Sequence, residues 1–405
     1  MTDAPPRHNP DYLAKDYDSF RSLLLDHLAA STSLSTSPDV ASVESALVEV
    51  LAYVGDNLSY FQDAVATEAY LATARQRVSV RRHARLLDYR LNEGCSARVW
   101  ACLETAADDV PVPRGTALLT RIKEVEAVRV PRGFEASTFV FETMHDVLLV
   151  GAHNRMALHD PATPPRPGDT AAKLAGSLER LAAGDVLIFR HLPEGRAQAV
   201  RLISAEAKAD WTEIAWQEED AFPAAFPDGG SWTILGNVVL AHHGQSFVAR
   251  LPEVPREGLA ELSLPFPDLS FGVPYQHAEA VLRSAAQTME QDPRAAEPML
   301  SLRETAAFLD EQAIAGRQAW TGARDLVHAA QFDRSFAVEP SGGPEATLRF
   351  GDGVHGRRLQ PDWTYFAHYR SGRGARGNMG PGPLAHVVTA DDRILGISNP
   401  LPGSG

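Results

Sequence analysis

The sequence predicts an α+β protein, in which an N-terminal long-helix bundle is followed by β-rich domains, with some helix in the region 275–330. Apolar residues recur every three or four positions over roughly the first ninety residues. Short alternating runs separated by Gly, Pro and Asp follow Gly94, and a weaker helical period returns after Tyr275. The chain has 405 residues. It is therefore expected to form several domains, since one domain usually holds about 100 to 200 residues.

Apolar residues that share one helical face predict a first helix, which is expected to end near Ser31. That face consists of Leu13, Tyr17, Phe20, Leu24 and Leu28. The polar stretch STSLSTSPD then predicts a second helix start, with Ser37 as N-cap and Pro38 in the first turn.

The second helix carries a strong apolar stripe, and acidic residues such as Glu49, Asp56 and Asp63 project from the other side. The stripe consists of Val43, Leu47, Val50, Val54, Leu58, Phe61 and Val65. If the helix continues towards Ala72, it is roughly 50 Å long, which exceeds the width of a small domain. Such a helix is expected to pack against neighbours. Tyr53 and Tyr60 lie outside the stripe and are candidates for a second contact.

A third helix is expected to end at Asn92 or Gly94, with an apolar face opposite a basic one. The apolar face is Val80, Ala84, Leu87 and Leu91, and the basic face is Arg81, Arg82 and Arg85. These arginines, with Arg75 and Arg77, are the one basic concentration in the chain. A solvated helix face is the simplest interpretation, and contact with an acidic partner is the alternative. Nucleic acid is disfavoured because no aromatic residues interleave with the charges.

The alternating runs after Gly94 are expected to be strands, and proline-rich stretches mark loops between them. The runs are RVWACLE, TFVF, GDVLIF, AVRLIS, WTEIAW and WTILGNVVL. We expect a helical segment over 1–94, a β-rich domain over 95–250, a mixed connector over 251–330 and a β-rich C-terminal domain over 331–405.

Composition argues against several classes of function. The formal net charge of −14 opposes nonspecific binding to nucleic acid or to an anionic membrane. Cys95 and Cys102 are too far apart for a zinc knuckle or a redox pair, so free thiols are expected. No stretch of about 18 apolar residues and no N-terminal signal-peptide pattern occur, which predicts cytoplasmic assembly without membrane insertion.

Two glycine-rich motifs could suggest ligand sites. Gly372, Gly374 and Gly377 match the dinucleotide-binding pattern, but Pro381 and Pro383 follow and oppose the helix that such a loop must open. A turn between strands is therefore expected. In FGDGVHG one carboxylate, Asp352, is too few for a calcium loop, which predicts a tight hairpin or bulge.

The histidines do not form a recognisable metal or catalytic motif. His242 and His243 adjoin a predicted strand end, where neighbouring side chains point to opposite faces and cannot easily share a metal. HExxH, GxSxG and P-loop patterns do not occur in the sequence. We therefore predict no catalytic residue, no cofactor and no metal, and we do not expect an enzyme.

A long block of the sequence resembles the baseplate J-like family, the baseplate assembly proteins of contractile phage tails and extracellular contractile injection systems. The block is LVEVLAYVGDNLSYFQDAVATEAYLATARQRVSVRRHARLLDYRLNEG, and the resemblance continues through WTILGNVVLAHHG, DPRAAEPMLSL and RFGDGVHGRRLQPDWTYFAHYRSGRGARGN. It covers most of the chain in order. The resemblance implies a structural wedge subunit that surrounds the hub and relays the contraction trigger by rigid-body rearrangement.

The resemblance also implies partners and contact residues. The partners are a second wedge protein, a sheath-initiator protein, central hub and spike proteins, and further copies of the chain around a six-fold ring, all within an injection particle or phage tail. The residues expected in the shared helix bundle are Val43, Leu47, Tyr53, Val54, Leu58, Tyr60, Phe61, Leu87 and Leu91. Arg81, Arg82 and Arg85 are candidates for contact with an acidic partner. Relatives commonly continue beyond NPLP, so a shorter version or a fragment is expected.

The alternative function is a receptor- or glycan-binding tail module. Its basis is the set of tryptophans that could form aromatic sugar platforms, namely Trp100, Trp211, Trp216, Trp232, Trp320 and Trp363. The helical first third of the chain argues against this alternative. A cell-wall hydrolase would need an acid and base pair that the sequence does not reveal.

Overall fold

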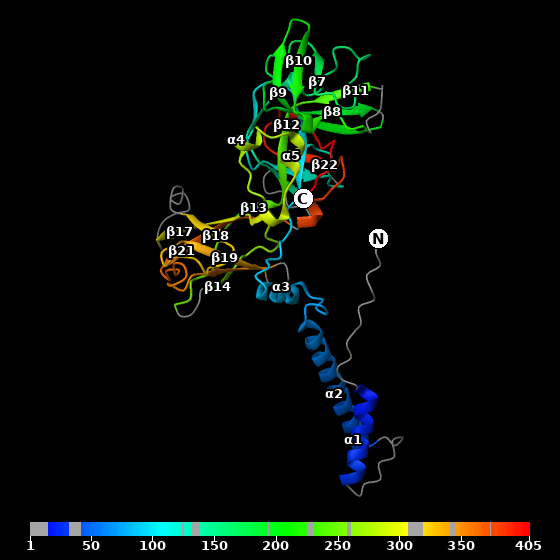
Figure 1. The fold of residues 1–405 in the computed structure, drawn as a ribbon, viewed down its shortest axis with the longest axis vertical. Helices are drawn as coiled ribbons and strands as arrows, with labels where there is room; N and C mark the ends of the chain where they lie inside the picture. Colours follow the sequence, from blue (N-terminus) through cyan, green and yellow to red (C-terminus); the bar gives the residue numbers. More distant parts are fainter. Residues whose placement is uncertain are drawn as a thin grey trace. The chain divides into compact units, whose positions relative to one another are not determined.

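The computed structural model divides the chain into two compact units, Met1–Leu91 and Asn92–Gly405 (Figure 1). The described residues are 15–31, 42–123, 125–131, 138–192, 194–224, 231–256, 261–306, 319–340, 345–372 and 374–405. The first unit is helical and the second is rich in strands, so the predicted α+β class is confirmed.

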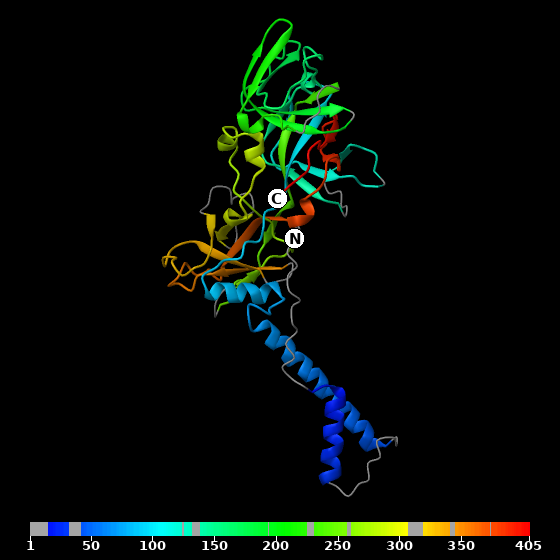
Figure 2. The ribbon, with the colours of Figure 1, turned by 45° about the vertical axis from the view of Figure 1, so that its right-hand side comes forward.

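The helical unit contains α1 (Tyr17–Ser31), α2 (Val43–Glu68) and α3 (Arg77–Leu86). Helices α1 and α2 pack side by side (Figure 2). Phe20 of α1 lies over Gly55 of α2, where a Cβ atom would stand only 2.9 Å from the Phe20 ring. Glycine therefore allows the close approach. Arg21 Nη2 also lies 3.9 Å from Glu49 Oε1 across the same contact.

Helix α2 begins later than the sequence predicted. Its N-cap is Ser42, whose Oγ accepts a hydrogen bond from the Ser45 main-chain N at 3.1 Å. The expected N-cap Ser37 was therefore wrong for this helix, although Ser37 and Pro38 themselves lie outside the described residues, as does Leu13. With 26 residues, α2 is about 39 Å long rather than the expected 50 Å.

The turn from α2 to α3 is fixed by Glu68, the last residue of α2. Its carboxylate accepts hydrogen bonds from the main-chain N of Arg75 at 3.0 Å and of Gln76 at 3.2 Å. His83 of α3 donates from Nε2 to the Glu68 carbonyl oxygen at 2.8 Å. Hydrogen bonds from Ser79 and then Arg75 lower the pKa of the Glu68 carboxyl. The helix consequently ends here and does not continue to Ala72.

Helix α3 also ends earlier than predicted. Asp88 has a φ of 53°, and the main-chain N of Asp88 and of Tyr89 donate to the carbonyls of Arg85 and Ala84 at 3.1 and 3.0 Å. This pair of bonds is the Schellman ending, in which aspartate tolerates the left-handed conformation that usually calls for glycine. The expected continuation to Asn92 was wrong, and Leu87 and Leu91 lie beyond the helix.

The first large sheet of the second unit contains seven strands. In spatial order they are β23 (Ile394–Ser398), β1 (Arg98–Thr105), β12 (Val238–His243), β5 (Val140–Thr143), β3 (Ala117–Thr120), β22 (Leu384–Val388) and β4 (Arg129–Val130). Strand β1 is buried on both faces, because Val99 and Leu103 enter one hydrophobic core while Trp100 and Cys102 enter another.

The second sheet has five strands, in the order β11 (Ser231–Leu235), β8 (Val186–Leu192), β9 (Ala197–Ala207), β10 (Trp211–Trp216) and β7 (Ala171–Ala175). Aromatic side chains fill its core. The ring of Phe222 packs edge-on against Phe189 and Trp216, with centroids 5.3 and 5.9 Å apart. Such T-shaped pairs suit the positive edges and negative faces of aromatic rings.

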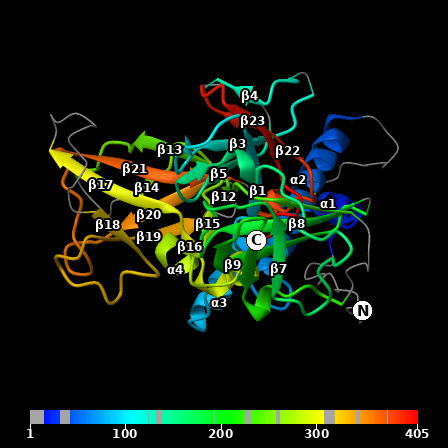
Figure 3. The same ribbon diagram turned by 90° about the horizontal axis from the view of Figure 1, so that it is seen from above.

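The third sheet again has seven strands (Figure 3). They are β13 (Gln245–Arg250), β21 (Trp363–Ser371), β17 (Leu300–Ala306), β18 (Ala319–Ala323), β19 (Ser335–Pro340), β20 (Ala346–Phe350) and β14 (Glu261–Ser263). In its core Trp320 Nε1 donates to Glu304 Oε2 at 3.0 Å, and Arg334 Nε lies 2.9 Å from Glu304 Oε1. The buried carboxylate is thus satisfied from two sides.

Small elements complete the second unit. Two ribbons pair β2 (Val110–Val112) with β6 (Val147–Leu149) and β15 (Phe271–Gly272) with β16 (Glu297–Pro298). The short helices are α4 (His277–Ala280), α5 (Ala285–Met289), η1 (Gly151–His153), η2 (Glu218–Asp220), η3 (Pro293–Ala295) and η5 (Gly374–Gly377). Helices α4, α5 and η3 confirm the predicted helix in the region 275–330.

The sheets combine strands that are distant in the sequence. Strands β22 and β23 join β1 in the first sheet, and β21 pairs with β13 in the third. The chain passes directly from β12 of the first sheet to β13 of the third at Gly244, which has a φ of 112°. The expected division of residues 95–405 into three consecutive segments stays a prediction, but it does not follow these sheets.

Candidate interaction surface

The apolar stripe of α2 is exposed. Exposure of its side chains ranges from 47% at Val54 to 81% at Val43. The stripe residues are Val43, Leu47, Val50, Val54, Leu58, Phe61 and Val65. At about 100° per residue these positions share one side of the helix.

Small side chains form the α2 face that packs on α1. The buried residues of α2 are Val48, Ala52 and Ser59, with Gly55 under the Phe20 ring. These positions lie roughly opposite the stripe on a helix of 3.6 residues per turn. Helix α2 therefore uses its small-residue face within the unit and leaves its large apolar face uncovered. Covering each large side chain would contribute ~1.5–3 kcal/mol.

Helix α2 is strongly acidic as well as apolar. It contains Glu44, Glu49, Asp56, Asp63 and Glu68 and no lysine or arginine. Its net charge is therefore negative, although Glu49, Asp56 and Asp63 lie on the side away from the stripe, and a helix of positive net charge would suit it best as an occupant.

The structure brings most of the predicted contact residues together on α2. Tyr53 and Tyr60 are exposed beside the stripe, and the Tyr60 ring packs edge-on against Phe61 with centroids 6.2 Å apart. Leu87 is exposed and Leu91 is half-buried, but both follow α3 and neither belongs to the α2 stripe. Further exposed apolar residues that the sequence did not single out are Leu51, Tyr70, Leu71, Leu86 and Tyr89. The contact roles themselves stay predictions.

The predicted basic contact lies on α3. Arg82 and Arg85 are exposed and Arg81 is half-buried. Arg85 also stands in the last turn of α3, where a cation is favoured by the negative end of the helix dipole. The position of Arg85 is therefore compatible with both interpretations, a solvated helix face and contact with an acidic partner.

The GRGARG segment serves close packing. A Cβ atom at Gly377 would lie 2.6 Å from the His243 ring, and one at Gly372 would lie 2.7 Å from the Gly244 Cα. Its residues Gly374–Gly377 form the single turn η5, and no helix follows at 378–383. The interpretation as a turn is therefore confirmed, and the geometry is not that of a pyrophosphate loop.

The FGDGVHG segment forms a tight turn, but not the expected hairpin, because β20 and β21 on either side of it are not neighbours in the third sheet. Asp352 Oδ1 accepts hydrogen bonds from the main-chain N of Val354 and of His355, each at 2.8 Å. These bonds, His355 first, lower the pKa of the Asp352 carboxyl. Because the carboxylate binds its own turn, it supplies no cluster of oxygen ligands. Within the part of the chain that the structure describes, no group of three or more His, Cys, Asp or Glu residues could hold a metal.

His242 and His243 end strand β12 and point to different surroundings. His242 Nδ1 lies 3.0 Å from Arg370 Nη1, whereas the His243 ring packs edge-on against Phe141 at 5.3 Å. Burial, followed by the nearby charge of Arg370, lowers the pKa of both imidazoles, that of His243 to about 4. Cys95 and Cys102 are buried free thiols, and burial raises the pKa of each.

The tryptophans do not form a sugar-binding platform. Trp100, Trp216, Trp232 and Trp320 are buried in the hydrophobic cores. Half-buried Trp363 packs against the core of the third sheet, and half-buried Trp211 has Lys173 Nζ 5.4 Å from its ring. The structural basis for a glycan-binding module was therefore wrong. No helix among the described residues is long and apolar enough to span a bilayer.

Residues 16–86 match the family model described as bacteriophage baseplate protein, N-terminal domain. This segment extends from the start of α1 to the end of α3. The match supports a baseplate protein. It supports a structural role for the chain in a baseplate, and it does not distinguish the J-like wedge family from other baseplate proteins.

No curated protein matches this chain. Among solved structures, the chain is similar to one chain of the type VI secretion system TssK-TssF-TssG baseplate subcomplex, revealed by cryo-electron microscopy. The sequence identity is 9%, the TM-score is 0.34, and the similarity covers 89% of this chain and 72% of that chain. A TM-score this low does not establish a shared fold.

Proposed function

We propose that the chain is a structural, non-enzymatic baseplate wedge component of a contractile injection system or phage-tail-like particle. It links hub and sheath-initiator proteins to the baseplate periphery and relays the contraction trigger by conformational change. Support comes from one observation above all: the segment that matches a baseplate domain exposes a continuous apolar stripe along α2.

The occupant that we assign to the stripe is an amphipathic helix of a second wedge protein. Steps of three and four residues along the stripe suit helix-to-helix packing of the coiled-coil kind. From Val43 to Val65 the stripe is about 33 Å long, so a partner helix of about 20 residues would cover it. Tyr53 and Tyr60 would contact the same partner from the side.

Charge decides between this partner and a second copy of the chain. Two α2 helices laid against each other would each carry five acidic residues and no lysine or arginine. Helices with net charges of the same sign repel each other, which disfavours pairing. The partner helix is therefore a different chain with a basic balance of charge, and further copies around the ring meet through other surfaces.

The test starts from deletion of this chain in the cells that make the particle. Electron microscopy is expected to show no assembled sheathed particles, and intact contractile particles would contradict the proposal. The deleted strain is then complemented with the Leu47→Asp, Leu58→Asp double variant, which places charges in the stripe. We expect assembly to stay lost.

The matched control is Gln62→Asp, at an exposed position of the same helix outside the stripe. It adds a carboxylate without entering the apolar face, so particles are expected to form. Far-UV circular dichroism of the purified double variant checks that α2 remains helical. Particle assembly by a folded double variant would show that the stripe is not the contact surface.

A further inference from the structure

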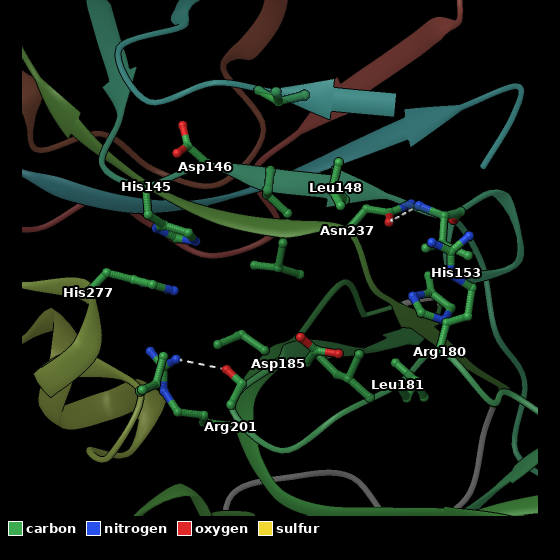
Figure 4. Close-up of a pocket in the computed structure, with 18 of the residues that line it drawn as sticks. His145, Asp146, Leu148, His153, Arg180, Leu181, Asp185, Arg201, Asn237 and His277 are labelled. Atoms are coloured by element: carbon green, nitrogen blue, oxygen red, sulfur yellow. Dashed lines mark hydrogen bonds between the residues drawn. The ribbon is translucent and has the colours of Figure 1, made fainter. Parts of the chain in front are cut away.

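The second unit contains a cavity of about 740 Å³ that the proposed baseplate role does not use (Figure 4). Residues of β1, β2, β6 and β12 line it together with residues of β8 and β9 from the second sheet. Helix α4 contributes His277 at one end. Cavities that bind small molecules usually measure about 300–1,000 Å³, so this one has the size of a ligand site.

Three nitrogen-bearing side chains gather at the α4 end of the cavity. His145, His277 and Arg201 lie together there in Figure 4. The imidazole rings of His145 and His277 are stacked, with centroids 4.2 Å apart and planes inclined by 13°. Tyr275 Oη lies 3.0 Å from His277 Nδ1, and this hydrogen bond fixes the orientation of the His277 ring.

Arg201 is a buried cation, and within the described part of the chain its guanidinium forms no direct ion pair with a carboxylate. Burial lowers its pKa, although Asp220 and Asp185 lie near enough to oppose this larger effect. Only 3% of the Arg201 surface is exposed to solvent. Nη1 donates to the Gly184 carbonyl oxygen at 2.9 Å and Nη2 to Thr288 Oγ1 at 3.3 Å, while Nε has no partner. Both acceptors are neutral. Burial of such a charge is costly unless an anion accompanies it.

Asp220, one of the acids near Arg201, is engaged elsewhere. Asp220 accepts a hydrogen bond from the Arg201 main-chain N at 2.9 Å, and its other bonds come from the main-chain N of Ala285 and Ala286 at 2.7 and 2.9 Å. Its carboxylate therefore fixes the start of α5. The guanidinium keeps its charge available to the cavity.

The rest of the cavity has an apolar middle, the two acids Asp146 and Asp185, and a far end that is already paired. Val147, Leu148, Val186 and Val238 contribute apolar surface. At the far end Arg180 pairs with Asp109 outside the cavity lining. Asp185 Oδ2 accepts a hydrogen bond from the Ala182 main-chain N at 2.9 Å, and burial raises the pKa of the Asp185 carboxyl, which favours its neutral form. A ligand would consequently meet one basic end and an apolar wall, with Asp146 and Asp185 as the acidic groups of the lining.

We propose that this cavity binds a small amphipathic organic anion, whose carboxylate or phosphate group lies at Arg201, His145 and His277 and whose apolar body lies along the valines. Arginine pairs with either oxyanion through several donors, and each imidazole adds one more. The proposal is independent of the baseplate role, because it rests on the second unit alone.

Proton uptake provides a further consequence. Burial, then the neighbouring His277 and Arg201, lower the pKa of His145 to about 4, against a smaller opposing effect of Asp146. Burial and Arg201 also lower the pKa of His277. An anion between these groups would favour the charged imidazoles and raise both values. Binding should therefore strengthen as the pH falls from about 7 towards about 5, above the free His145 value of about 4.

The test uses hexanoate and hexyl phosphate as probes of the full chain in isothermal titration calorimetry, with hexanol as the uncharged control. At least one anion is expected to bind at one site per chain, about tenfold more tightly than hexanol. The two anions distinguish a carboxylate site from a phosphate site. Failure of both anions, or equal binding of hexanol, would overturn the proposal.

The second test uses the variant His277→Ala. His277 is exposed at the cavity edge, so its replacement is not expected to disturb folding, whereas replacement of the buried Arg201 could do so. It is expected to weaken anion binding about tenfold and to reduce the pH dependence. The control is His328→Ala, an exposed histidine that does not line the cavity. Unchanged anion affinity in His277→Ala would also contradict the proposal.

Discussion

Arg370 on β21 forms a buried ion pair with Glu142 on β5, with Nη2 and Oε2 2.7 Å apart. The pair connects the third sheet to the first. Ser246 donates to Glu142 from its main-chain N at 2.7 Å and from Oγ at 2.6 Å, and Arg370 Nη1 lies 3.0 Å from His242 Nδ1. The two charges are thus held among several polar contacts beside Gly244.

Glu142→Gln is expected to lower the free energy of unfolding by about 3–5 kcal/mol, because it leaves the Arg370 cation buried without its counter-ion. Urea denaturation followed by tryptophan fluorescence measures the change. Glu206→Gln is the control, because it removes a carboxylate from the exposed pair with Lys208 and should leave the curve unchanged. A Glu142→Gln protein as stable as the parent would show that the pair does not hold the sheets together.

Acid should destabilise the second unit through its buried histidines. Burial and Arg370 lower the pKa of His243 from 6.5 to about 4 in the folded protein. The unfolded chain therefore binds more protons between these values, and stability present above pH 6.5 is lost as the pH falls to 4. For His243 the loss amounts to roughly 3 kcal/mol. Denaturation midpoints measured from pH 7.5 to 4 report it.

The substitution His243→Gln isolates this contribution. It removes the titrating group, so the dependence of stability on pH should become shallower even if the variant is less stable at pH 7. His159→Gln, which replaces an exposed histidine, is expected to leave the slope unchanged. An identical slope in the His243 variant would rule out His243 as a source of acid sensitivity.

Local sequence patterns predicted what depends on neighbours along the chain. The three-to-four spacing of Leu47, Val54 and Leu58 located the α2 stripe, but it could not show that Ala52 rather than the stripe faces α1. Helix ends were less predictable, because the ending of α3 depends on the left-handed conformation of Asp88.

Non-local pairing explains most of what the sequence could not reveal. The cavity brings His145, Arg201 and His277 together from three separate segments, and no spacing along the chain marks them as neighbours. Sheet order creates this proximity, since β9 lies in the second sheet while the residues before β6 adjoin the first. Similarly, the sequence placed His243 at the end of a strand, but it could not reveal the contact with Gly377. That contact arises because the later segment that contains Gly377 lies beside the end of β12.

Gly377→Ala should destabilise the protein by about 1–3 kcal/mol, because the new methyl group overlaps the His243 ring and the core must shift. Gly380→Ala is a matched control three residues away, where a Cβ atom meets nothing within 4 Å. It should leave stability nearly unchanged. Thermal unfolding of both variants measures the difference, and equal midpoints would show that the glycine is not required by packing.

The last prediction separates the stripe of α2 from its packed face. Leu58→Asn should change the local stability of α2 by less than about 0.5 kcal/mol, since the Leu58 side chain is 60% exposed in the unit. Ala52→Leu should destabilise the contact with α1 by about 1–3 kcal/mol, because Ala52 is fully buried there. Hydrogen exchange of the α2 amides measures both effects without relying on unfolding of the β-rich unit. If Leu58→Asn increased exchange as strongly as Ala52→Leu, the stripe would already be covered within the chain, and it would not be available to a partner helix.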